Sequence, residues 1–138
     1  MLKKKNKLFN LLIAHSTSLY IIWLIFIGIL TLLPGSVIPN ISWDFISIDK
    51  TVHIILFTVL VFLGLIGANY GNLKLFGKWP VITSISAALV YGYIIELLQS
   101  YVPQRSYDIA DLTADCVGTI VGYGLFLGVT KILPKKDR

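Results

Sequence analysis

Apolar residues along this chain gather in four long stretches with short polar segments between them. The stretches cover roughly residues 16–33, 52–69, 80–99 and 111–133. A helix needs about 20 mostly apolar residues to cross the hydrocarbon core of a membrane, and each stretch comes close to that length. Prolines lie at or just beyond these limits, where helices begin or end: Pro34, Pro80 and Pro134. The pattern predicts an all-α fold, with residues 1–138 forming a single domain of four transmembrane helices.

The composition supports a membrane location. Of the 138 residues, 56% are hydrophobic and only 14% are charged, whereas soluble domains have about 45–50% apolar and about 25% charged residues. Such a chain cannot cover its surface with polar side chains, so lipid is the solvent that suits it. The first stretch is long for the apolar part of a signal peptide, and no small-residue cleavage site follows it. We therefore expect it to remain as a membrane span.

The chain contains one cysteine, Cys116. A single cysteine excludes a disulfide within the chain. Because this residue lies inside an apolar run, we expect it to be buried as a small apolar side chain.

The positive charge gathers on one predicted side of the membrane. The formal net charge is +5. The only positively charged residues in loops 34–51 and 100–110 are Lys50 and Arg105. The positive-inside rule therefore places these loops outside and both termini in the cytoplasm. Such terminal basic clusters are typical of membrane proteins, and no nucleic-acid partner is expected. The other cations lie near the two ends or between the second and third stretches: Lys3, Lys4, Lys5, Lys7, Lys74, Lys78, Lys131, Lys135, Lys136 and Arg138.

This topology brings polar residues from three predicted helices to the outer layer. The second helix starts with Asp49 and His53, four residues apart on one face, and the third ends with Glu96 and Gln99. The charged segment 105–115 lies partly before the fourth helix and partly forms its first turns. At a rise of 1.5 Å per residue, carboxylates this close to a helix end lie about one turn below the membrane surface.

Residue spacing predicts that these carboxylates face the bundle. Asp108, Asp111 and Asp115 follow an i, i+3, i+7 pattern on one helical face, which continues to Gly118 and Gly122. Small residues mark faces where membrane helices pack closely, and a carboxylate facing lipid would be costly. A second strip of small residues ends in a carboxylate: Ser84, Ala88, Gly92 and Glu96.

We therefore predict an outward-facing acidic site for a ligand. With His53 neutral, its five carboxylates and two cations leave a charge of −3. A shared proton, the cations, a metal ion or a cationic ligand group would relieve the repulsion. The alternative is a polar network that only clamps helix ends. The predicted site residues are Asp49, Lys50, His53, Glu96, Gln99, Arg105, Asp108, Asp111 and Asp115.

Individual residues suggest different roles. Glu96, a carboxylate inside an apolar span, is the strongest functional signal, whereas Asp108 is better explained as a helix cap. Motifs of soluble enzymes are absent, so enzyme status stays open. Candidate catalytic residues are Glu96, His53 and Asp111. Chemistry also allows a divalent metal, such as zinc or manganese, on His53, Glu96, Asp111 and Asp115.

Three segments resemble the VanZ-like family: "LTLLPGS", "DKTVHIILFTVL" and "IELLQSYVPQRSYDIADLTADCVGTIVG". The resemblance covers roughly residues 30–130. It rests on residues that occur in the same order along the chain: Asp49, Lys50, His53, Glu96, Gln99, Arg105, Asp108, Asp111 and Gly118. One departure is Asp115, where the family pattern commonly has Asn. The resemblance implies a multi-pass protein of the bacterial cell membrane. The family's namesake is associated with resistance to teicoplanin.

Two functions follow as hypotheses. The first is an envelope factor that lowers antibiotic access or binding through membrane lipid, an envelope glycolipid or the glycopeptide itself. The second is an integral-membrane enzyme acting on a lipid-linked envelope substrate. In that enzyme, Glu96 or His53 would serve as general acid or base, and Asp111 and Asp115 would hold a metal or orient the base. Arg105 would bind phosphate. A channel is disfavoured because the polar residues stop at the outer layer.

Overall fold

The computed structural model describes the backbone of residues 2–37 and 48–131 and the side chains of residues 10–37 and 48–131. Within these ranges the chain is helical and contains no strand. Four helices are each long and apolar enough to cross a membrane, which confirms the predicted all-α architecture. The elements are α1 (Leu2–Thr31), the short 3₁₀ turn η1 (Gly35–Val37), α2 (Ile48–Asn69), η2 (Lys74–Phe76), α3 (Pro80–Gln99) and α4 (Ile109–Thr130).

Helix boundaries differ from the predicted spans at the starts of α1 and α2. Helix α1 already begins at Leu2, because no glycine or proline interrupts the sequence before Gly28. Helix α2 begins at Ile48, before the apolar stretch 52–69, so Asp49 and Lys50 belong to its first turn, and Asp49 lies on the same helix as His53 as predicted. The predicted limit of the fourth span, at 133, lies outside the described residues.

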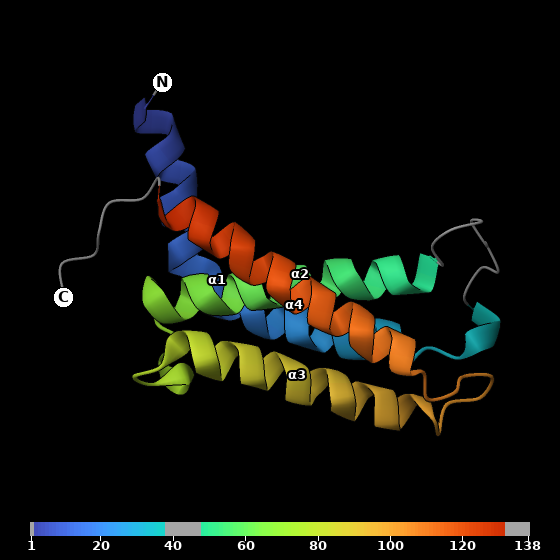
Figure 1. Ribbon diagram of the computed structural model, residues 1–138. Helices are drawn as coiled ribbons and strands as arrows, with labels where there is room; N and C mark the ends of the chain where they lie inside the picture. Colours follow the sequence, from blue (N-terminus) through green and yellow to red (C-terminus); the bar gives the residue numbers. More distant parts are fainter. Residues whose placement is uncertain (1, 38–47, 132–138) are drawn as a thin grey trace.

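Helix α2 lies at the centre of the bundle. Neighbouring helices run in opposite directions, so α1 starts and α4 ends at the same end of the molecule (Figure 1). Helix α2 contacts each of the other three helices. In its most apolar window, 56% of the residues are buried, against 17–33% in the other three helices. The core is built around α2 and includes Phe57, Leu60, Leu65 and Ile66.

Two glycines allow α4 to pack closely against α2. A Cβ atom added to Gly118 would meet the backbone carbonyl oxygen of Ile54, and one added to Gly122 would meet that of Thr58. The Thr58 hydroxyl donates a hydrogen bond of 3.1 Å to the Gly118 carbonyl, which joins the two helices at this point. The predicted contact face of α4 is therefore confirmed.

The outer surfaces of the bundle are apolar. Large hydrophobic side chains are exposed on α1, α3 and α4, as expected for helices that face lipid; they include Ile22, Ile29, Ile82, Ile94, Ile120 and Leu125. The prediction that Cys116 is buried is wrong, because its side chain is exposed. It directly follows the buried Asp115, and one residue turns a helix by about 100°. In a membrane protein, an apolar neighbourhood can mean lipid rather than protein interior.

Candidate functional site

All five acidic residues that the structure describes gather at one end of the bundle. This is the end where α1 and α3 finish and α2 and α4 begin (Figure 1). Every predicted site residue lies on one of these helix ends or in the segment between α3 and α4. We call the set the polar cluster: Asp49, Lys50, His53, Glu96, Gln99, Arg105, Asp108, Asp111 and Asp115.

The polar cluster has a buried layer and a more exposed rim. His53, Glu96, Gln99 and Asp115 are 0–1% exposed, and Asp111 is 3% exposed. The remaining members are only partly buried: Asp49, Lys50, Arg105 and Asp108. Burying a polar group without a hydrogen-bond partner is costly, so the partners of each buried side chain determine the chemistry available to the cluster.

His53 and Asp115 form the buried centre of the cluster. The Nδ1 atom of His53 lies 2.9 Å from Oδ1 of Asp115, so α2 and α4 are joined by a hydrogen bond between two buried side chains. The other oxygen of Asp115 has no partner among the described residues. A Cβ atom on Gly92 would lie 2.6 Å from that oxygen, so the small-residue strip of α3 provides the room for this carboxylate.

Two cations at the rim connect the start of α2 with the start of α4. The Nζ atom of Lys50 lies 3.0 Å from Oδ2 of Asp108 and 3.1 Å from Oδ1 of Asp111. Arg105 approaches Oδ1 of Asp49 at 3.5 Å. The Lys50–Asp108 pair is exposed enough to contribute little to stability by itself, whereas Lys50 also pairs with the buried carboxylate of Asp111.

Asp108 and Glu96 fix the first turn of α4. The Asp108 side chain accepts a 2.8 Å hydrogen bond from the Ala110 N–H, which confirms the predicted cap. This hydrogen bond, together with the Lys50 ammonium, lowers the pKa of Asp108 below its ordinary value. The backbone N–H of Asp108 donates to one oxygen of Glu96, while the other Glu96 oxygen has no partner in the described part of the chain.

Gln99 joins the cluster to the end of α1. Its side-chain amide donates a 2.8 Å hydrogen bond to the Thr31 carbonyl, and nearby the Gly35 N–H donates to the Pro103 carbonyl at 3.1 Å. Thr31 could not be predicted as a partner, because the accepting group is a backbone carbonyl that every residue carries.

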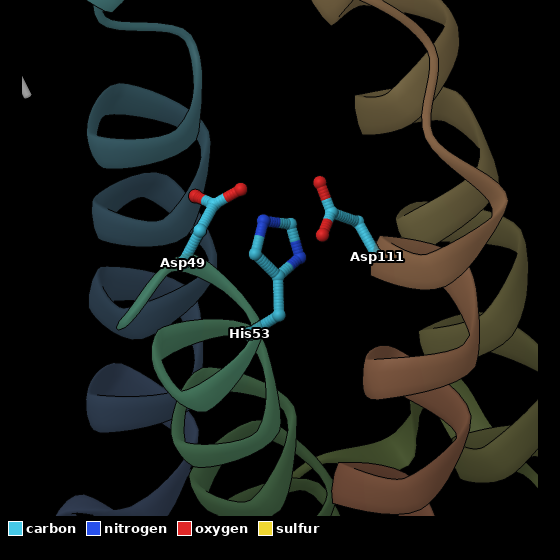
Figure 2. Close-up of side chains that lie close together, drawn as sticks. All are labelled: Asp49, His53 and Asp111. Atoms are coloured by element: carbon cyan, nitrogen blue, oxygen red, sulfur yellow. The ribbon is translucent and has the colours of Figure 1, made fainter. Parts of the chain in front are cut away.

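His53 also lies between two carboxylates, those of Asp49 and Asp111 (Figure 2). One ligand-type atom from each of these three residues lies within 4.8 Å of the other two. This group differs from the predicted metal set, because it includes Asp49 and leaves out Glu96 and Asp115. The signal for Asp49 was its position four residues before His53, which places both side chains on one helical face.

The charges of the cluster do not balance. With His53 neutral, five carboxylates against Lys50 and Arg105 leave −5 + 2 = −3. Carboxylate and imidazole groups in this number can bind a cation or transfer a proton. The arrangement is therefore chemically suited to cation binding or to acid–base chemistry, in addition to joining the helices.

Comparison with known proteins identifies a family that the chain resembles along its length. The family model described as VanZ/LLP1 matches residues 2–132, nearly the whole chain. No curated protein and no solved structure matches the chain.

Proposed function

Because the chain belongs to the VanZ/LLP1 family and is a multi-pass membrane protein, we propose that it acts at the bacterial cell envelope through its polar cluster. The role we propose is in resistance to glycopeptides of the teicoplanin type or in envelope homeostasis. One observation carries this proposal: three helices bury a histidine, a glutamine and three carboxyl side chains together at a single end of the bundle. Carboxylates inside membrane helices are costly, and proteins keep them mainly for function.

The distribution of cations supports an outward-facing position for this end. The segment between α2 and α3, at the opposite end of the bundle, carries Lys74 and Lys78. Positively charged loops favour the cytoplasm. The polar cluster then meets the periplasmic or extracellular surface, where glycopeptides and envelope precursors are found.

The negative excess of the cluster suggests how it recognises a partner. Three uncompensated negative charges attract amino groups of a glycopeptide or of lipid headgroups, while Arg105 at the rim can pair with a phosphate. Membrane lipid, an envelope glycolipid and the glycopeptide itself are the partners that this chemistry fits.

A susceptibility assay tests the proposal. We expect expression of the wild-type chain in a susceptible bacterial host to raise the teicoplanin concentration that inhibits growth. Glu96→Gln and Asp111→Asn should abolish this protection at equal protein levels in the membrane, because each removes a buried carboxylate with little change in shape. His15→Gln is the control, since His15 is exposed on α1 away from the cluster. Unchanged protection in both cluster variants would contradict a functional role for the site.

The second candidate function is an integral-membrane enzyme acting on a lipid-linked envelope substrate. The position of His53 between Asp49 and Asp111 favours it, because an imidazole flanked by carboxylates is suited to general acid–base catalysis (Figure 2). Incubation of purified protein with lipid-linked envelope precursors, followed by mass spectrometry, tests this function. Precursors that stay unaltered with the wild-type protein would count against it.

A further inference from the structure

We propose that Asp49, His53 and Asp111 form a binding site for one divalent transition-metal ion, with zinc as the best fit. The group combines one imidazole with two carboxylates, which are ligand types that zinc accepts. Three protein ligands leave a fourth position open for water or for an oxygen of a bound anion, as in catalytic rather than structural zinc sites. This inference goes beyond the envelope role, and its test reads metal binding directly.

The hydrogen bond to Asp115 orients the ring of His53 for this purpose. An ionised carboxylate can only accept a hydrogen bond, so the 2.9 Å contact places the ring hydrogen on Nδ1. The lone pair of the neutral ring is then on Nε2, which makes no hydrogen bond within the described residues. A histidine that ligates metal through one nitrogen commonly donates its other N–H to a carboxylate. Asp115 is thus a positioning residue and not a ligand.

The spacing of the three groups leaves room for an ion. The ligand-type atoms lie within 4.8 Å of one another, and the two carboxylates flank the ring of His53 (Figure 2). Zinc bonds of about 2.1 Å in a tetrahedron separate neighbouring ligand atoms by roughly 3.4 Å. Rotation of the two aspartate side chains toward the ring would bring the ligand atoms from within 4.8 Å to this shorter spacing. An ion can reach the site from the rim, because Asp49 is partly exposed.

Nearby cations leave this site available. Lys50 and Arg105 contact Oδ1 of Asp111 and Oδ1 of Asp49, respectively. A second oxygen of each carboxylate can therefore face the ion. A divalent ion would also reduce the charge of the polar cluster from −3 to −1, which relieves the repulsion among its carboxylates.

Calorimetric titration of the purified protein in detergent, stripped of metal with a chelator, tests the site with Zn²⁺ alone. We expect saturable binding of one ion per chain. His53→Gln, Asp49→Asn and Asp111→Asn should each weaken it by more than about 100-fold, because each removes a ligand. Asp115→Ala should weaken it by about 10–100-fold, as loss of a carboxylate that orients a metal-binding histidine does. Asp115→Asn should restore most of the affinity, because its amide oxygen still accepts the Nδ1–H.

His15→Gln provides the matched control, since His15 is the other histidine of the chain and is exposed on α1. It should bind Zn²⁺ like the wild type. Size-exclusion profiles and helical circular dichroism identify variants that fail to fold. If His53→Gln is one of them, the zinc affinities of Asp49→Asn and of the two Asp115 variants test the proposal instead. The proposal is overturned if the wild type shows no saturable binding, if the ligand variants bind as well as the wild type, or if His15→Gln alone loses the ion.

Discussion

The Asp108 side chain makes two contacts that fix where α4 begins. One of its oxygens accepts the N–H of Ala110 and the other meets the ammonium of Lys50. Its role as a cap could be predicted from its place just before a helix. Its link to Lys50 could not, because that contact joins residues 58 positions apart in the sequence.

Replacement of Asp108 should loosen this helix start. We expect Asp108→Ala to lower the stability by about 1 kcal/mol, the usual effect of losing an N-cap. Thermal unfolding in detergent, followed by circular dichroism, measures the change. Asp108→Asn should recover most of the loss, because asparagine caps helices about as well as aspartate. An Ala variant as stable as the wild type would show that the cap contributes nothing.

The same residue gives the stability a dependence on acid pH. A carboxyl with a lowered pKa in the folded state stabilises the fold above its unfolded pKa, which is about 3.9. That contribution disappears as the pH falls through the lowered folded value. The advantage of the wild type over Asp108→Asn should therefore shrink below about pH 4. A difference that stays constant from neutral pH down to about pH 3 would contradict this assignment.

Helix packing was predictable where small residues repeat. The face of α4 that carries Gly118 and Gly122 and the α3 strip that ends at Glu96 are both buried, as their spacing predicted. Cys116 shows the limit of such reasoning, because a position within an apolar span does not reveal whether the side chain faces protein or lipid. Periodic small residues indicate the packed side of a membrane helix, whereas hydrophobicity alone does not.

The closest approach of α4 to α2 should be sensitive to a single methyl group. We expect Gly122→Ala to destabilise the bundle by about 1–3 kcal/mol, because its Cβ would press against the Thr58 carbonyl. Gly124→Ala is the matched control on the same helix, since nothing lies within 4 Å of its added Cβ. The control should keep or slightly raise the thermal midpoint, because alanine favours helix over glycine. Equal midpoints for the two variants would contradict the close contact.

For the whole molecule, the sequence was sufficient to predict four spans and the end at which the polar residues meet. It could not show that α2 is the central helix, because composition does not reveal which helices touch. Nor could it pair His53 with Asp115 rather than with Asp49, the residue one turn away on the same helix. Contacts between helices depend on their rotation and height in the bundle, and neither is encoded in local spacing.

Orientation in the membrane is the remaining prediction at this scale. Because Cys116 is exposed, labelling needs a Cys116→Ser background. In intact cells, Ser106→Cys should react with a membrane-impermeant thiol reagent, whereas Asn72→Cys, at the opposite end, should react only after lysis. Both positions are exposed, so their accessibility to the reagent is matched. The reverse pattern would place the polar cluster in the cytoplasm and remove the basis for a role on the outer face.

The pairing of α2 with α4 also has a consequence for biogenesis. Asp115 and Asp111, the partners of His53 and Lys50, lie on the helix that follows the other three in the chain. During synthesis, α2 and α3 are therefore made before these partners. Glu96 lacks its backbone donor until Asp108 has been made. A chain that ends before Asp108 would leave His53 and Glu96 without these partners, so the first three helices alone should be less stable in a membrane than the complete bundle.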